Sequence, residues 1–595
     1  MGLLGQVVER VWKLPHAHTR VARVERDVRV PMDDGASLLT DIWWPAGASS
    51  PPTLLMRSPY GRSGSLGDLL GAIYARRGFR VLVQSCRGTF GSGGSFAPQF
   101  HERADGLATV RWLERQPWFD GRLAMSGPSY LGYVQWAIAA DAGLSLRAIC
   151  PHITASNLAG HWYRGSSFSL ENAIRWTTMV STQERTHFPL LRALLGTTER
   201  RVRRHIDHLP IAELDEKIIG KRVPFWRDFV DHASLDDPFW VPADHSCHVA
   251  DVRVPVNMVS GWYDIFLPLQ LADYRALVAA GNPPHLLIGP WAHTDGAGMA
   301  QRVRETFATL RAHLCDEPDG LRKAPVRLHV MGVDRWQDFG GWPPPGFAPR
   351  PWHLHAGGRL ATAQPASSVP DRYRYDPADP TPIVGGTLLG RGSGRRNQSK
   401  VEARSDVLTY TSDPLPRDLD VIGDVEARVF VSSSLEHFDV FVRLCDVDET
   451  GRSTNVCDGI QRVDPRRWRR RDDGVFEIRV ALWPTAQRFR ARHRIRVQVS
   501  SGAHPRFIRN LGTGDPIATA TAMRVADQAV YHDPERPSAL FLPVFAVKAI
   551  GVGESRTRPT SSCSPCLLHR FRPKGPQHAE DGSHDLVAKV ELSQK

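Results

Sequence analysis

Three residues of the types that carry out acyl transfer each follow a short apolar run of the chain: Ser129, Asp264 and His293. Acyl transfer by a serine needs a base that takes the hydroxyl proton and a carboxylate that orients the base. On a parallel sheet these groups come from loops at the carboxyl ends of strands, in the chain order serine, acid, histidine. An isolated aspartate after a strand is usually a helix cap, and an isolated histidine is usually a surface residue. The order and spacing of the three nevertheless favour a common catalytic site.

The residues around Ser129 have the pattern of a nucleophile elbow, a sharp turn from a strand into a helix. An apolar run precedes Gly127, and a run compatible with a helix extends over residues 130–140. Such a turn exposes the hydroxyl at the amino end of the helix, and it needs glycines where a side chain would clash. The strict motif places a glycine two residues after the serine, whereas here Leu131 has that position and Gly132 follows. The motif alone is therefore weak.

The elements that must position these residues are predicted by the hydrophobic pattern. Short apolar runs alternate with helical segments within residues 1–149 and again within 250–320. This alternation predicts one catalytic domain with a mostly parallel sheet and helices on both faces. Residues 150–249 have helical periodicity and many aromatic side chains. We interpret them as a helical cap inserted over the carboxyl edge of the sheet, where such folds bind ligands.

The hydrophobic pattern of the sequence changes at about residue 325, where helical periodicity is replaced by short strand-like runs separated by turn residues. The pattern over residues 325–550 predicts an antiparallel β-sandwich or jelly roll. The clearest strand candidates are 425–431, 439–447, 476–482 and 495–500. Residues 385–400 are predicted to form a long loop. The polar, Ser/Pro/Arg-rich stretch 554–595 is predicted to be a disordered tail.

Composition excludes several functional classes. Hydrophobic residues make up 42% of the chain and charged residues 23%, as in ordinary globular proteins. No apolar run is long enough to cross a membrane, and no secretory signal is visible, so we expect no membrane partner. The net charge of +12 is spread along the chain, which is more typical of a solvated surface than of a nucleic-acid site. The basic stretch 466–471 is accordingly predicted to be a surface loop.

The eight scattered cysteines indicate a reducing compartment, and we expect a cytoplasmic location. Cys563, Cys566 and His569 resemble part of a zinc site, but a fourth ligand at suitable spacing is missing. We therefore expect neither a metal ion nor a cofactor.

Three motifs together resemble those of the CocE/NonD hydrolases, a family of serine esterases, acylases and X-prolyl dipeptidyl peptidases. They are Gly127-Pro-Ser-Tyr-Leu-Gly132, Gly261-Trp-Tyr-Asp264 and Gly289-Pro-Trp-Ala-His293. The resemblance extends over residues 25–545. It includes Ser58-Pro-Tyr-Gly61 and, in the β-rich part, Asp458-Gly-Ile-Gln-Arg462 and Ala503-His-Pro-Arg-Phe-Ile-Arg-Asn510.

The resemblance implies an α/β-hydrolase domain with an inserted helical cap and a C-terminal jelly roll. It also implies that Ser129 is the nucleophile, His293 the base and Asp264 the residue that orients the base. The oxyanion hole would be the backbone N–H of Tyr130 and the phenol of Tyr60. The absence of a His-Gly-Gly-Gly donor loop agrees with a side-chain donor. Aromatic positions of the family's acyl pocket match Trp162, Trp176 and Phe266, for which core packing is an equally good account.

Three functions remain open from the sequence. The first is hydrolysis of an ester or amide of a small acyl group through an acyl-enzyme on Ser129, and the sequence is compatible with a homo-oligomer. The second is X-Pro dipeptidyl-peptidase activity, which would need an anionic clamp for the free amine of the substrate, and no compact acidic cluster in the cap suggests one. The third is a non-catalytic protein that binds a ligand through the jelly roll.

Overall fold

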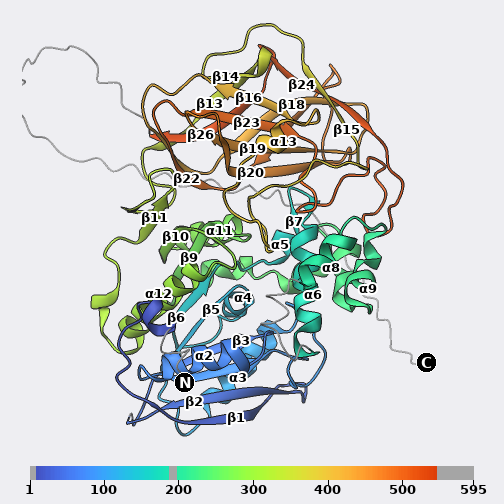
Figure 1. Cartoon of the computed structure of the whole chain (residues 1–595). Helices are drawn as coiled ribbons and strands as arrows, with labels where there is room; N and C mark the ends of the chain where they lie inside the picture. The colour runs from blue at the N-terminus through green and yellow to red at the C-terminus, as the bar shows by residue number, and fades with distance from the viewer. Residues whose placement is uncertain (1–7, 48, 186–196, 546–595) are drawn as a thin grey trace, which may run out of the picture. The chain divides into compact units, whose positions relative to one another are not determined.

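The computed structural model describes residues 8–47, 49–185 and 197–545 (Figure 1). Its first sheet has the strand order β1-β2-β4-β3-β5-β6. The strands are β1 (Val21–Pro31), β2 (Ser37–Pro45), β3 (Thr53–Ser58), β4 (Arg80–Ser85), β5 (Leu123–Pro128) and β6 (Leu146–His152). The strands from β3 to β6 pair in parallel, whereas β2 pairs antiparallel with both of its neighbours, β1 and β4.

A second sheet continues the first. It has the order β12-β11-β10-β9, and a parallel bridge between Ile149 and Val256 joins it to β6. Its strands are β9 (Asn257–Tyr263), β10 (His285–Ala292), β11 (Val326–Val330) and β12 (Arg335–Phe339). Strands β9, β10 and β11 are parallel. The two sheets therefore form the mostly parallel α/β-hydrolase sheet predicted from the sequence.

Helices cover both faces of this sheet because neighbouring strand residues point to opposite sides. In β3, Leu54 packs with Ile73 and Phe307, whereas Leu55 packs with Val110 and other residues on the opposite face. The helices are α2 (Gly64–Ala75), α3 (Glu102–Glu114), α4 (Tyr130–Trp136), α11 (Leu267–Ala279) and α12 (Gly296–Leu314). Each fully buried strand thus has two apolar faces, as parallel strands between helices require.

The insertion between β6 and β9 is mainly helical, as expected, although β6 extends to His152. It contains α5 (Ala159–Trp162), α6 (Leu170–Thr182), α8 (Thr197–His205), α9 (Leu214–Ile219) and α10 (Pro224–Asp231), with a hairpin of β7 (Tyr163–Arg164) and β8 (Ser167–Phe168). Figure 1 shows α6, α8 and α9 grouped together in teal. The core of the insertion is aromatic: the ring centroid of Trp176 lies 5.8 Å from that of Phe225 and 6.3 Å from that of Phe229.

The C-terminal region is β-rich and almost entirely antiparallel, as predicted. Among the described residues it forms one 14-stranded sheet with branches. Its strands are β13 (Phe347–His355), β14 (Arg359–Ala361), β15 (Asp371–Tyr375), β16 (Leu408–Ser412), β17 (Leu419–Gly423), β18 (Glu426–Ser433), β19 (Phe438–Val447), β20 (Ser453–Val463), β21 (Phe476–Ala481), β22 (Thr485–Phe489), β23 (Arg494–Ser500), β24 (Ala526–Asp533), β25 (Arg536–Pro537) and β26 (Ala539–Phe545). One short helix, α13 (Ser399–Glu402), interrupts them. The predicted disordered tail lies outside the described residues.

Candidate active site

Ser129 lies at the turn between β5 and α4. Its backbone has φ 60° and ψ −125°, a conformation that costs a residue with a side chain of the order of 1–3 kcal/mol. The surrounding backbone holds it there. The Ser129 N–H donates to the carbonyl of His152 at 2.9 Å, and the Ser129 carbonyl accepts from the N–H groups of Gly132 and Tyr133. The predicted elbow is present in the structure.

The two glycines of the elbow are needed because neighbouring side chains lie very close. A Cβ on Gly127, which has φ +154°, would lie 2.4 Å from the Cβ of Leu131. A Cβ on Gly132 would lie 2.4 Å from the Cγ2 of Thr154. The departure from the strict motif therefore has a geometric reason, since α4 meets the segment after β6 at Gly132 and not at Leu131.

Asp264 directly follows β9 and is fully buried. Strand β9 extends to Tyr263, so Gly261 lies within the strand, at a position that has no room for a side chain. The reason is close packing: a Cβ on Gly261 would lie 2.2 Å from the carbonyl oxygen of Trp291. The carboxylate accepts a hydrogen bond from the N–H of Phe266 at 2.8 Å, which fixes its orientation.

His293 directly follows β10 and joins the other two residues. Its Nδ1 lies 2.8 Å from Oδ2 of Asp264, and its Nε2 lies 3.1 Å from Oγ of Ser129. The edge of the Phe266 ring packs on the imidazole, with 5.5 Å between the ring centroids. This geometry allows Nε2 to take a proton from the serine hydroxyl while the buried carboxylate holds Nδ1–H.

Tyr60 and Tyr130 lie beside Ser129 but differ in how their side chains are engaged. The Tyr60 hydroxyl accepts a hydrogen bond from the indole N–H of Trp176 at 3.0 Å. Burial raises the pKa of Tyr60 to about 12, and hydrogen bonding with Trp176 and Ser129 opposes the rise. At neutral pH this phenol is therefore protonated and able to donate. The Tyr130 hydroxyl instead donates to Glu102 at 2.8 Å.

The backbone N–H of Tyr130 is available for another role. Tyr130 is the first residue of α4, and the first N–H groups of a helix have no acceptor within it. Two donors, this N–H and the Tyr60 phenol, thus lie near Ser129. Both tyrosines, Ser129 and His293 line the same chamber.

A small chamber of about 20 Å³ opens at these groups, with room for little more than one water molecule. Trp162, Trp176 and Phe266, the three aromatic residues expected to wall an acyl pocket, all line it. The rest of the described lining outside Ser129, His293 and the two tyrosines is Gln99, Leu158, Asn172, Ile265 and Leu389. No carboxylate belongs to that described lining.

None of these five further lining residues was predicted from the sequence, and two of them, Asn172 and Leu389, contact each other. Leu389 belongs to the predicted loop 385–400 of the β-rich region, and its N–H donates to the side-chain oxygen of Asn172 at 2.8 Å. Leu389 also lines a larger neighbouring cleft of about 670 Å³, next to Ala292 and Thr294. An irregular loop carries no periodic signal, so the sequence pattern gave no indication that its tip reaches the chamber.

His161 is another residue near the site that the sequence did not suggest. It is buried, with its ring 5.0 Å from that of Phe266 and its Nε2 3.2 Å from Nδ2 of Asn172. Burial lowers the pKa of His161 to about 3, and the positive charge of Arg506 acts in the same direction. His161 is therefore a neutral packing and hydrogen-bonding residue near neutral pH.

The other motifs with a conceivable function are used structurally. Arg466 pairs with Asp464 and Arg467 with Asp236, as expected of a surface loop. Within the described parts of the chain, no group of three or more His, Cys, Asp or Glu residues is arranged to hold a metal ion. Cys563, Cys566 and His569 lie outside the described residues. No helix in the described parts is long and apolar enough to cross a membrane.

Comparisons with known proteins agree with this architecture. Residues 34–295 match the X-Pro dipeptidyl-peptidase (S15) family, and residues 320–541 match the X-Pro dipeptidyl-peptidase C-terminal non-catalytic domain. The chain is 32% identical to the cocaine esterase of Rhodococcus sp. over 576 residues, which cover 88% of this chain and 98% of that protein.

Two solved structures show the same fold. An α-amino acid ester hydrolase superposes with a TM-score of 0.75 at 22% identity, covering 89% of this chain and 98% of that one. An aminopeptidase from a marine sediment Thaumarchaeota archaeon superposes with a TM-score of 0.72 at 24% identity, with the same coverage. These findings do not favour a non-catalytic binding protein. The chain belongs to the cocaine esterase and S15 peptidase family, whose members are serine hydrolases of ester and amide bonds.

Proposed function

We propose that the chain hydrolyses esters or amides of small, apolar or aromatic acyl groups through an acyl-enzyme on Ser129. The observation that carries this proposal is the continuous hydrogen-bonded series from Ser129 Oγ to His293 Nε2 and from His293 Nδ1 to Asp264. A serine held in a strained elbow with its hydroxyl on a buried imidazole is arranged for nucleophilic attack.

The mechanism follows from these positions. His293 Nε2 takes the hydroxyl proton as Ser129 Oγ attacks the substrate carbonyl carbon, and Asp264 stabilises the imidazolium that forms. The carbonyl oxygen becomes an oxyanion, which the Tyr60 O–H and the Tyr130 N–H stabilise. His293 then gives its proton to the leaving group, which departs and leaves the acyl-enzyme. Water, activated by the same imidazole, hydrolyses the ester and restores Ser129.

The lining of the chamber supports the substrate class. Its apolar walls of Trp162, Trp176 and Phe266 suit an apolar or aromatic acyl group, and its small volume limits the size of that group. An X-Pro dipeptide would present a charged amine to the pocket, and the described lining offers no carboxylate to pair with it. We therefore favour an esterase or acylase over a dipeptidyl peptidase.

The experiment that tests this proposal is a burst-phase assay with p-nitrophenyl esters of graded acyl length. We expect a burst of p-nitrophenol equal to the enzyme concentration, and one covalent adduct on Ser129 after treatment with an active-serine phosphonate. Ser129→Ala should lower kcat by at least about 10⁴-fold, as loss of the nucleophile does in other serine hydrolases. X-Pro p-nitroanilides serve as the comparison substrates.

If folded enzyme shows no burst and forms no adduct, the proposal is refuted. Faster turnover of X-Pro anilides than of all esters would assign the peptidase activity instead. A reducing, cytoplasmic location completes the proposal. It is supported by the six described cysteines, which are free and of which four are buried.

A further inference from the structure

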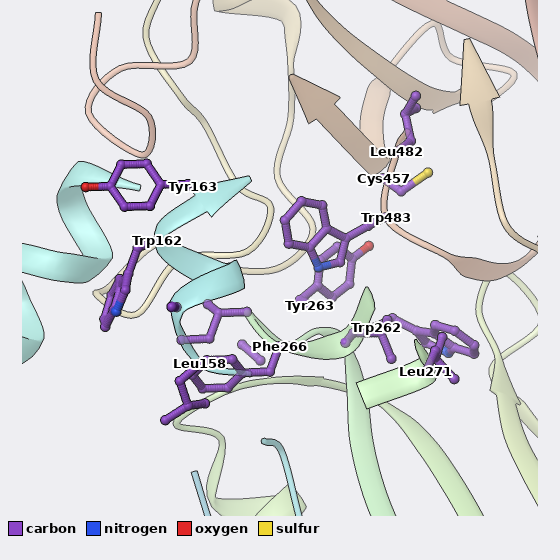
Figure 2. Close-up of a cluster of buried hydrophobic side chains, with 14 of the residues drawn as sticks. Leu158, Trp162, Tyr163, Trp262, Tyr263, Phe266, Leu271, Cys457, Leu482 and Trp483 are labelled. Atoms are coloured by element: carbon purple, nitrogen blue, oxygen red, sulfur yellow. The ribbon is translucent and has the colours of Figure 1, made fainter. Parts of the chain in front are cut away.

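A tryptophan of the β-rich domain, Trp483, contacts the candidate site at Asp264. Trp483 follows β21 and is buried in the same cluster as Tyr263 and Phe266 (Figure 2). Its indole N–H donates to the backbone carbonyl of Asp264, with 3.0 Å between Nε1 and the oxygen. A residue of the C-terminal domain is thereby bonded to the residue whose carboxylate holds His293.

The bond from Trp483 has a distinct place among those that fix Asp264. The Asp264 N–H donates to the carbonyl of Gly261 at 2.9 Å, and the carboxylate accepts from the N–H of Phe266. The Asp264 carbonyl also accepts from the N–H of Leu267, at the longer distance of 3.4 Å. These partners all lie within three residues of Asp264, from the end of β9 through the turn that follows it, so they move with that turn. Trp483 ties that turn to a separate element.

Trp483 is itself held from two sides. Its backbone N–H donates to the carbonyl of Asp458 at 2.9 Å. The guanidinium of Arg506 lies 4.6 Å from the centroid of its ring, within the range of a cation–π contact. The segment that carries Trp483 lies close to β20, and this approach needs Gly459, because a Cβ on Gly459 would lie 2.3 Å from the carbonyl oxygen of Ala481. The indole therefore has little freedom to shift.

Beneath the indole lies a buried ionic cluster, formed by Arg443, Asp458 and Arg506. All three side chains are about 1–2% exposed. Oδ2 of Asp458 accepts from Arg443 at 2.9 Å, and Oδ1 accepts from Arg506. Burying ions is costly, so such a cluster adds little net stability and instead favours one geometry over others.

The same cluster accounts for two motifs that the proposed chemistry does not use. Asp458 begins one of the two β-domain motifs that carry the family resemblance, and Arg506 lies within the other. The cluster joins residues nearly fifty positions apart directly below the tryptophan that contacts Asp264.

We propose that Trp483 is a positioning residue for Asp264, held in place by the Arg443–Asp458–Arg506 cluster, so that the C-terminal domain completes the catalytic apparatus. The inference rests on the proposed function, in which Asp264 orients His293. If the carbonyl loses its indole donor, the turn that carries the carboxylate can shift, and the imidazole is then less well aligned with the serine hydroxyl. Misalignment of catalytic groups lowers the rate of the chemical step more than it weakens substrate binding.

The test replaces the indole by a phenyl ring. Trp483→Phe retains an aromatic side chain and removes the N–H donor. We expect kcat for p-nitrophenyl acetate to fall about 10-fold, with KM changed less than about twofold. The matched control is Trp226→Phe, which removes an equally buried indole N–H, donated to the carbonyl of Ile211 at 3.1 Å in the helical insertion. It should leave kcat within about twofold of the parent value.

A second pair of variants asks whether Trp483 acts through Asp264. Trp483→Phe is introduced into the Asp264→Ala enzyme, and residual acylation is followed in single turnovers at high enzyme concentration. A residue that acts only through the Asp264 carboxylate should have less than about a twofold effect there, because coupled residues are not additive.

The outcomes separate this inference from the proposed function. If Asp264→Ala leaves kcat unchanged, the proposed role of Asp264 fails. If Asp264→Ala strongly lowers turnover but Trp483→Phe has no effect in the parent enzyme, or lowers the rate of acylation equally in both backgrounds, the proposed function stands and the positioning role of Trp483 is wrong. Thermal unfolding of all variants establishes that the proteins compared are folded.

Discussion

At the scale of single residues, the site depends on residues whose backbone conformation or pKa differs from the ordinary one. Ser129 is held in a conformation that most residues avoid, and Tyr60 has its pKa raised to about 12 by desolvation. Both effects require the surrounding structure to supply energy, through backbone hydrogen bonds at Ser129 and through packing against the hydrophobic core at Tyr60. Such altered residues gather at functional sites because the chemistry needs groups that water alone would not provide.

Tyr60 offers a direct test at this scale. Tyr60→Phe removes the phenol O–H and keeps the ring, so it removes one donor of the proposed oxyanion hole. We expect kcat to fall by about 10²–10³-fold, as loss of one such donor does elsewhere, with little change in KM. Tyr373→Phe is the control, since its buried hydroxyl bonds to Ser501 and Gln528 in the β-rich domain. Equal activity of the two variants would exclude Tyr60 from the oxyanion hole.

At the scale of elements, close approaches at the carboxyl edge of the sheet decide where the functional residues lie. Gly261 permits the end of β9 to lie against the segment that carries Trp291, and Gly132 permits α4 to contact the segment after β6. Each approach brings one side chain of the candidate site toward the same point. The glycines act here by their small size, whichever backbone conformation they adopt.

The elbow should be intolerant of a single methyl group at Gly132. Gly132→Ala places a Cβ 2.4 Å from Thr154, so α4 must move or the core must strain. We expect the free energy of unfolding to fall by about 1–3 kcal/mol, and kcat to fall as Ser129 shifts. Gly340→Ala, where no heavy atom lies within 4 Å of the added Cβ, should change neither quantity. Denaturant unfolding and ester hydrolysis measure the two effects, and wild-type behaviour of Gly132→Ala would contradict the packing argument.

At the scale of the whole molecule, the described chain behaves as one structural unit in which the β-rich region reaches the catalytic domain. Leu389 contributes to the chamber and Trp483 bonds to Asp264. The buried cluster around Asp458 underlies this contact, and its charges have a consequence for stability. Burial by itself raises the pKa of Asp458, but Arg506 and Arg443 outweigh it, so the pKa lies below its ordinary value.

The sign of the resulting pH dependence follows from linkage. A carboxyl group whose pKa is lower in the folded than in the unfolded state contributes stability above its unfolded pKa of about 3.9 and loses it as the pH falls further. Asp458→Asn should therefore lower the free energy of unfolding at pH 7 by about 3–5 kcal/mol, because two buried guanidinium groups lose their partner. It should also weaken the decline in stability below about pH 4. Urea unfolding at pH 7 and pH 3 tests both statements.

The exposed pair of Asp413 and Arg359 supplies the control for that measurement. The Asp413 side chain is 77% exposed and lies 3.4 Å from Arg359. Asp413→Asn should cost less than about 1 kcal/mol at pH 7, as surface ion pairs usually do. An equal cost for Asp413→Asn and Asp458→Asn would show that burial of the cluster does not determine its energetic role.

The sequence by itself determined the local elements and the order of the catalytic candidates. Alternating apolar runs predicted the mostly parallel sheet, and the strand-end positions of Ser129, Asp264 and His293 predicted that they converge, because parallel strands end at one edge. Family motifs added Tyr60 and the aromatic wall of Trp162, Trp176 and Phe266. Each of these signals is carried by a few residues close together in the chain.

Only the tertiary structure decided which distant segments complete the site. Leu389 lies on an irregular loop, and Trp483 follows a strand of another domain, so neither position has a periodicity or spacing that points to the catalytic residues. Close packing of Gly261 against Trp291 near the end of β9 is likewise a tertiary contact between separate segments. Contacts between segments more than a hundred residues apart depend on how whole domains pack, and this information is spread over many residues that each look ordinary in the sequence.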